Sequence, residues 1–523
     1  MQLPSILTPT ALALCLGLSL SAQTQQARTA PPPEQAELNA AMNITDLNAR
    51  LKELQRIMAA YPESRIFREI KSSILRTVSQ SADTLEKLLV AQKEVISSAK
   101  LQDRFSLMTT ATSILFSHSK AANFSKSAVL EAVQDYKNSA MQLLSNPDFI
   151  STIPENRREA SINTNKTAFE LSMANAHLMN GNAQSALTIL EEYKKTGQAS
   201  PVFYNLLGQS YTNLNRHSEA LEAFLDASVN GMPAATASAK AAYEKVHGSE
   251  AGFTDRLKAL QTSLPFHPPP FKAPENWQGK AVLAELFTGS ECPPCVAADF
   301  AFDGLIESYP AKHLVILEYH LPIPRYDPMM NPATKARQDY YKVSSTPTVI
   351  IDGATPASGG GGRAASEATF NRYKDVIDPI MGSATPVAIR ASAKLSDQTV
   401  TVNCEFSKVV EGADYNVVLV QRVQEFAGYN GIVHHKMVVR DIATVAPNTT
   451  ASITFNLPNN EKATDAHIAE WGKTAADLRR IGPPATSWPM TISKINRSDL
   501  QAVVFVQDKE SKQVHNAFIV DVK

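Results

Sequence analysis

The sequence has no excess of charge of either sign. It carries 50 Lys and Arg residues against 51 Asp and Glu residues, so its formal net charge is −1 and its pI is near 6.8. Proteins that bind nucleic acid or an anionic membrane surface through their overall field are clearly basic. The composition therefore argues against both partners. With 44% hydrophobic residues, it also argues against a disordered chain.

Cysteine is scarce, with four residues in a chain of 523. Cys15 lies in an N-terminal apolar run, which leaves Cys292, Cys295 and Cys404 for the rest of the chain. Secreted disulfide scaffolds are much richer in cysteine, so that class is excluded. One close pair and one distant residue instead predict a redox-active pair and a buried structural thiol, Cys404.

An apolar run long enough to span a membrane is also missing at the N-terminus. The run Ala11–Leu20 is shorter than the ~20 residues that a spanning helix needs, and it is followed by the small residues Ser21 and Ala22. This order is typical of a secretory signal. We expect residues 1–22 to be a signal peptide and the mature protein to be periplasmic or secreted, without a membrane span. An uncleaved anchor is the alternative.

A chain of this length is expected to form two to four domains. Residues 23–37 are polar and Pro-rich, and residues 38–264 contain few Gly or Pro and repeat apolar positions at helical spacing. The segment 265–276, with Pro265 and Pro268–Pro270, predicts an extended linker.

Within the helical segment, residues 167–234 contain a repeat. Laid 34 residues apart, Ala174 matches Gly208, Ala186 matches Ala220, Leu190 matches Phe224 and Tyr193 matches Ala227. These positions resemble the small and large packing residues of tetratricopeptide repeats. The resemblance implies paired helices. They would form either a groove for a protein partner or a helical packing domain.

Residues 277–382 alternate between predicted strands and helices, as in an α/β domain. The strands are expected over 281–287, 314–319 and 348–352, and the helices over 292–306, 333–341 and 367–381. The first helix begins at Cys292-Pro293-Pro294-Cys295. A CxxC pair between a strand and a helix indicates redox chemistry. As a zinc site it would lack a second pair, so no metal is expected here.

The motif Cys292-Pro293-Pro294-Cys295, together with Thr346-Pro347 before an apolar strand, resembles the thioredoxin superfamily. The resemblance implies a cis-proline at Pro347, with Thr346 and Pro347 contacting the substrate. It also implies that an exposed Cys292 is the nucleophile and that Cys295 resolves the mixed disulfide, without a diffusible cofactor. The helix N-terminus would stabilise the Cys292 thiolate.

Three further residues near the motif are candidates for tuning its reactivity. Glu291 places negative charge beside Cys292, and Glu285 is a candidate for proton transfer during resolution. His320 directly follows a predicted strand and begins a Pro-rich segment, up to residue 332, that could form a substrate rim. It could tune the thiol or bind copper with the cysteines, or be an ordinary loop histidine.

From residue 386 to 523, seven short β-branched or alternating runs predict a β-sandwich, with an insertion over residues 459–497. The hypothesis is an exported thiol-disulfide oxidoreductase that acts on protein substrates and leans toward reductase or isomerase. The alternatives are a redox-silent binding scaffold and a copper-handling protein.

Overall fold

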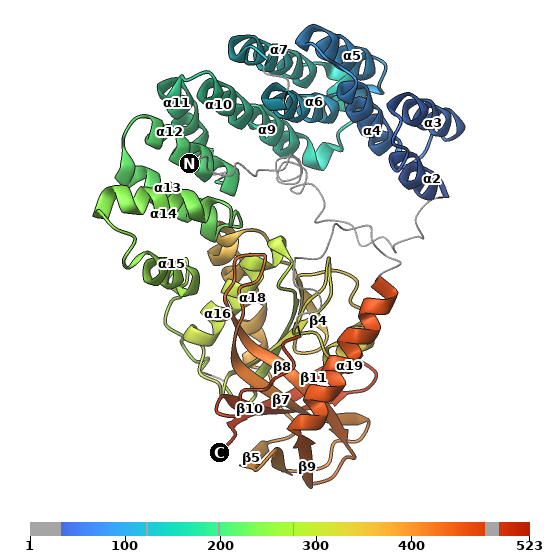
Figure 1. Cartoon of the computed structure of the whole chain (residues 1–523). Helices are drawn as coiled ribbons and strands as arrows, with labels where there is room; N and C mark the ends of the chain where they lie inside the picture. Colours follow the sequence, from blue (N-terminus) through green and yellow to red (C-terminus); the bar gives the residue numbers. More distant parts are fainter. Residues whose placement is uncertain (1–32, 122–123, 197–198, 276, 476–490) are drawn as a thin grey trace. The chain divides into compact units, whose positions relative to one another are not determined.

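The computed structural model describes residues 33–121, 124–196, 199–275, 277–475 and 491–523 (Figure 1). The predicted signal peptide and Cys15 lie outside the described residues. The described residues form two compact units, which fall within Met1–Ala227 with Ala234–Glu250 and within Ser228–Pro233 with Ala251–Lys523. No helix in the described ranges is both long and apolar enough to cross a membrane.

The first unit is helical, as the apolar spacing predicts. Its helices are α2 (Pro33–Met42), α3 (Leu47–Ala60), α4 (Phe67–Gln80), α5 (Leu85–Ser97), α6 (Leu101–Ala121), α7 (Lys126–Leu144), α8 (Pro147–Ser151), α9 (Arg158–Ala168), α10 (Glu170–Met179), α11 (Ala183–Lys194), α12 (Pro201–Asn213), α13 (His217–Val229) and α14 (Ala235–His247). Side-chain oxygens of Asp46, Thr84 and Ser200 accept hydrogen bonds from the first turns of α3, α5 and α12. These caps define where the helices begin.

The predicted repeat corresponds to the helical pairs α10–α11 and α12–α13. All eight matched positions are buried. Gly208 of α12 shows why a small residue is needed, because an added Cβ would lie 2.5 Å from the ring of Phe224 on α13. The glycine allows the two helices to approach each other closely, so the repeated small and large residues are explained by helix packing.

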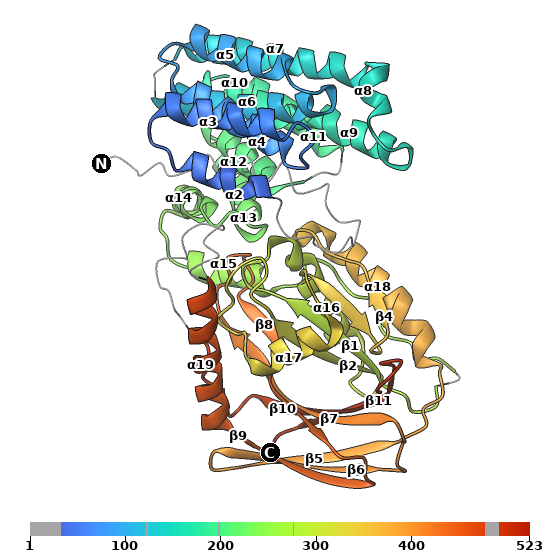
Figure 2. The ribbon, with the colours of Figure 1, turned by 90° about the vertical axis from the view of Figure 1, so that its right-hand side faces the viewer.

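The second unit contains an eight-stranded mixed sheet, a three-stranded sheet and the helices that cover them (Figure 2). Its elements are α15 (Phe253–Thr262), β1 (Val282–Thr288), α16 (Val296–Ser308), β2 (Leu314–His320), α17 (Pro332–Tyr341), β3 (Thr348–Ile351), β4 (Thr355–Ala357), α18 (Ser366–Met381), β5 (Ile389–Ser396), β6 (Thr399–Phe406), β7 (Ala413–Glu425), β8 (His434–Val445), β9 (Thr450–Asn456), α19 (Leu457–Ala475), β10 (Leu500–Asp508) and β11 (Val514–Asp521).

The large sheet joins the two segments that the sequence suggests are separate domains. Its strand order is β11-β10-β7-β8-β2-β1-β3-β4, so β1–β4 of the α/β segment continue into four strands of the C-terminal segment. β1 and β2 are parallel, β3 is antiparallel to β1, and β8 meets β2 at Glu318 and Val438. The seven C-terminal strands therefore lie in two sheets that share a core, and the larger of these sheets is continuous with that of the α/β segment. β7, β8, β10 and β11 extend the large sheet, and β5, β6 and β9 form the small one.

Core packing also crosses the predicted boundaries. Phe266, from the predicted linker, packs against Phe370 in the core of the second unit, and the division between units falls at Glu250 and Ala251 instead. Side chains of β7 and β10 are buried on both faces, and one face packs against the small sheet, where Cys404 is buried. The predicted insertion contains all but the first two residues of α19, and residues 476–490 lie outside the described ranges.

We predict that Gly208→Ala destabilises the helical unit. The added methyl group would overlap the ring of Phe224, and overpacking of this kind costs about 1–3 kcal/mol, against a gain of ~1 kcal/mol in helix propensity. Urea unfolding followed by far-UV circular dichroism measures the difference. A second change, Phe224→Leu, should recover part of the loss. A Gly208→Ala variant more stable than the wild type would contradict the close packing.

Candidate active site

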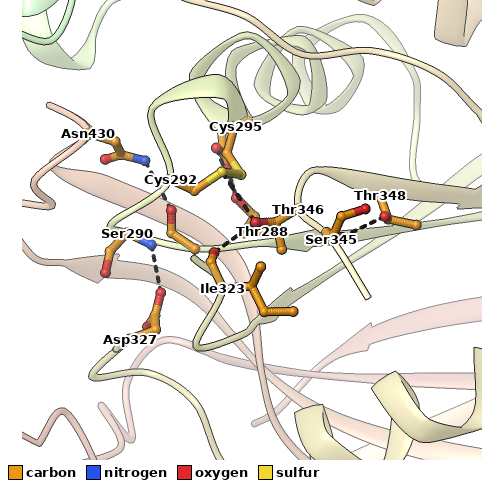
Figure 3. The surroundings of a disulfide bond; sticks show 12 residues. Thr288, Ser290, Cys292, Cys295, Ile323, Asp327, Ser345, Thr346, Thr348 and Asn430 are labelled. Carbon is orange, nitrogen blue, oxygen red and sulfur yellow. Dashed lines mark hydrogen bonds between the residues drawn. A yellow bond between two sulfur atoms is a disulfide. The ribbon is translucent and has the colours of Figure 1, made fainter. Parts of the chain in front are cut away.

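The cysteine pair lies where strand β1 meets helix α16. Every residue of β1 is buried, and a turn at Gly289–Glu291 connects the strand to a short 3-10 helix, Pro293–Cys295, that leads into α16. The two prolines suit this position because the first turn of a helix does not use their missing N–H groups. Cys292 and Cys295 form a disulfide (Figure 3).

Thr346 and Pro347 lie beside the pair, as the resemblance implies. The peptide bond between them is cis. The Thr346 hydroxyl lies 3.3 Å from Cys292 Sγ and 2.8 Å from the carbonyl oxygen of Ile323, and its single hydrogen can be donated to one of them at a time (Figure 3). Thr346 is the described side chain with a hydrogen bond to the disulfide.

The glycine run Gly359–Gly362 contacts the start of the active-site helix. The Gly361 N–H donates to the carbonyl oxygen of Pro294 at 2.7 Å, and its carbonyl oxygen accepts from the Ala297 N–H at 3.0 Å. A Cβ on Gly360 would lie 3.1 Å from both the Pro294 oxygen and the Pro347 ring. One N–H of the helix N-terminus is therefore already used, and fewer remain to stabilise a thiolate.

Both sulfur-bearing residues are buried. Cys292 and Cys295 have 0% exposure, whereas Pro293 and Pro294 between them are exposed. The resemblance implies an exposed Cys292, but in the oxidised pair the Cys292 side chain is buried. Residues that are remote in sequence enclose the turn, and their approach cannot be inferred from the motif alone.

His320 lies at the end of β2, and Asp327 holds its ring. The imidazole Nδ1 lies 3.0 Å from Asp327 Oδ2, which also accepts the Ser290 N–H at 2.6 Å. Burial by itself raises the pKa of Asp327, but His320 and two backbone N–H groups outweigh burial and lower it. The segment after β2 thus turns inward at Asp327 beneath the cysteine turn, while Arg325 and Tyr326 remain half-buried.

Glu285 has a structural role. Its carboxylate forms a bidentate ion pair with Arg337 of α17, at 2.7 and 2.9 Å, and accepts hydrogen bonds from the hydroxyls of Tyr319 and Tyr341. Both oxygens are occupied by these donors. Proton transfer by Glu285 during resolution, which the sequence analysis considers, therefore finds no support.

Glu291 precedes Cys292 and is half-buried. Burial raises its pKa to about 7, with Arg325 acting in the opposite direction and Asp327 in the same direction. Its carboxylate therefore gains negative charge as the pH rises through neutrality. The predicted negative charge beside Cys292 depends on pH in this range.

A group of buried acids, on the face of the sheet opposite Glu285, was not predicted from the sequence. Asp299 lies one helical turn after Cys295 and accepts the Thr288 hydroxyl at 2.8 Å. Burial is the main cause that raises the pKa of Asp299 to about 7, that of Asp303 to about 6 and that of Glu318 well above its usual value. The sequence feature that could have indicated this group is Asp299, an acidic residue in the mostly apolar helix after the motif.

We predict that Asp299→Asn reduces the pH dependence of stability. The carboxyl has a raised pKa in the fold, so its stabilising contribution is complete below about pH 4 and is lost as the pH rises through about 7. Urea midpoints between pH 4 and pH 8 should therefore fall less steeply in the variant. Asp465→Asn, at an exposed position, serves as the control. Identical slopes for Asp299→Asn and the wild type would contradict a protonated buried Asp299.

We predict that Arg337→Met destabilises the second unit by about 3–5 kcal/mol, because it leaves the buried Glu285 carboxylate without its cation. Adding Glu285→Leu should recover part of this loss, since a buried ion pair is often replaceable by apolar side chains. Urea unfolding of the two variants gives both values. A loss below about 1 kcal/mol for Arg337→Met would show that the ion pair is not needed.

Comparisons with known proteins give no family assignment. No family model and no curated protein matches the chain. One similar solved structure is a domain of the outer membrane lipoprotein Omp28 from Porphyromonas gingivalis, at 15% identity over 27% of this chain and 91% of that chain, with a TM-score of 0.15. Another is a tetratricopeptide repeat protein from Parabacteroides merdae, at 13% identity over 37% and 91% of the two chains, with a TM-score of 0.15. At these scores, neither likeness supports a statement about fold or activity.

Proposed function

We propose that this chain is an exported thiol-disulfide oxidoreductase that acts on protein disulfides through Cys292 and Cys295. The observation that carries the proposal is the disulfide at the junction of β1 and α16, with the Thr346 hydroxyl 3.3 Å from Cys292 Sγ. A dithiol at a helix start is the arrangement that thiol-disulfide exchange uses.

The order of elements around the pair supports the proposal. Strand β1, helix α16 and the parallel strand β2 are followed by α17, the antiparallel strands β3 and β4, and α18. This succession agrees with the thioredoxin-like domain that the motif resemblance implies. The pair lies at the C-terminal end of β1, where ligands and active sites commonly lie in α/β sheets.

The proposed reaction moves two electrons from the protein dithiol to a substrate disulfide. The Cys292 thiolate attacks one substrate sulfur, a mixed disulfide forms, and the first substrate thiolate leaves and takes a proton from solvent. The Cys295 thiolate then attacks Cys292 Sγ, which restores the internal disulfide and releases the second substrate thiol. An external thiol reductant regenerates the dithiol. No diffusible cofactor takes part.

The surroundings of Cys292 favour a reductase or isomerase over a strong oxidant. Pro293 and Pro294 offer no N–H to a thiolate, and the Ala297 N–H is bound to Gly361. Glu291 adds negative charge as it ionises near pH 7. A poorly stabilised thiolate makes the dithiol a better reductant.

The redox-silent scaffold remains the second candidate because both cysteines are fully buried. On that reading, the helical repeats hold a protein partner and the disulfide only stabilises its turn. The copper-handling alternative has less support, because the two cysteines are bonded to each other and Asp327 holds the Nδ1 of His320.

The decisive experiment measures whether the pair exchanges. We predict that the purified chain, equilibrated in glutathione buffers of graded redox ratio, shows a reversible two-electron couple. We also predict that Cys295→Ser accumulates a mixed disulfide at Cys292, because the resolving thiol is gone. Alkylation and mass spectrometry of peptides detect both. Cys292→Ser is the matched control and should trap far less. A pair that stays oxidised throughout, with no adduct on Cys295→Ser, would overturn the oxidoreductase and favour the scaffold.

A further inference from the structure

The loop between β7 and β8 contacts the cysteine turn just before the pair. The Asn430 N–H donates to the carbonyl oxygen of Ser290 at 3.0 Å, and its side-chain amide donates to the carbonyl oxygen of Gly289 at 3.3 Å (Figure 3). Asn430 Oδ1 accepts the Ile432 N–H at 3.2 Å. Asn430 is only 2% exposed, so it links the loop to the turn in a place from which water is largely excluded.

The same loop also contacts the chain just after the pair. Ile432 packs against Val296 and Phe300, the first and fifth residues of α16, and all three side chains are buried. The loop thus contacts the backbone at Gly289 and Ser290 on one side of the disulfide and the helix on the other. The two cysteines lie between these two sets of contacts.

Gly428 fits the loop closely to the turn. An added Cβ at this position would lie 3.0 Å from the carbonyl oxygen of Ser290 and 2.7 Å from Asn430 Oδ1. Ser290 is held from below as well, because its N–H donates to Asp327. Its peptide groups are therefore fixed from two directions, two residues before Cys292.

We propose that the loop Gly428–Ile432 is a clamp that positions the disulfide turn, so that a thiol reaches Cys292 only when this loop moves away. The inference rests on the proposed function and adds a means of controlling it. In the closed state Cys292 is buried, and attack along the S–S axis requires access to its sulfur. The rate of reduction then equals the fraction of open molecules multiplied by the rate for an accessible disulfide.

The clamp can be tested by the rate at which dithiothreitol reduces the full chain under native conditions. The reagent thiolate attacks Cys292 Sγ, the bond to Cys295 breaks, and ring closure of the reagent leaves two protein thiols and one cyclic disulfide. Asn430→Ala removes the side-chain bond to the turn, and Gly428→Ala pushes the loop away by steric overlap. Each should increase the rate about tenfold, the factor that corresponds to ~1.4 kcal/mol in the opening equilibrium.

Three controls separate release of the clamp from other effects. Tyr429→Ala alters an exposed side chain of the same loop, and Asn403→Ala alters an exposed asparagine of β6; both should react as the wild type does. Arg337→Met destabilises the same unit by removing the ion pair with Glu285, and removes no hydrogen bond of the loop; it should leave the rate nearly unchanged. Thermal unfolding by circular dichroism shows that each variant is folded before the measurement.

The outcomes distinguish the clamp from the oxidoreductase. The clamp is supported if Asn430→Ala and Gly428→Ala are both reduced faster than the wild type and the three control variants are not. If all chains are reduced at one measurable rate, or if Arg337→Met accelerates reduction as much as Asn430→Ala, the clamp is overturned and the oxidoreductase stands. If no folded chain is reduced and only urea-unfolded chains react, the proposed oxidoreductase is overturned, and the clamp with it.

Discussion

The structure around the cysteine pair depends on the pairing of β2 with β8. This junction, at Glu318 and Val438, joins the α/β segment to strands that lie more than a hundred residues further along the chain. Because β8 lies beside β2, the loop that precedes β8 reaches the turn before Cys292. Lys436 of β8 also pairs with Asp303 of α16 at 3.1 Å. Without β8, β2 would be an open edge of the sheet; through its pairing with β2, the C-terminal segment contacts the candidate site.

This arrangement buries several ionisable groups, and removing a charge from water costs free energy. Asp299, Asp303 and Glu318 share a region with one lysine, and their raised pKa values show that the fold favours their protonated forms. On the other face, Glu285 is paired with Arg337, and two tyrosine hydroxyls and the guanidinium supply the donors that burial removes. Buried carboxyl groups on the two faces of the sheet therefore differ in the number of hydrogen-bond donors around them.

Local sequence patterns predicted the individual strands and helices, because these elements depend mainly on short-range interactions. The strand before Cys292 and the helix after it lie close to their predicted ranges, and the segment after residue 386 contains the seven strands that its apolar runs predict. Partners across the sheet could not be predicted, since strand order depends on contacts between distant segments. The burial of Cys292 is of this kind, because Asn430, Gly361 and Thr346 come from three separate loops. The sheet face on which Glu285 lies could not be predicted either, because β1 is buried on both faces and its sequence does not alternate between polar and apolar residues.

Cys404 has a consequence for any thiol chemistry of this chain. It is 2% exposed in the core between the two sheets, and burial raises the pKa of its thiol to about 11. Only a thiolate attacks a disulfide, and at neutral pH this side chain forms almost none. An odd cysteine in an oxidising compartment would normally invite scrambling or covalent dimers. Burial in the core therefore keeps the Cys404 thiol from attacking the Cys292–Cys295 disulfide.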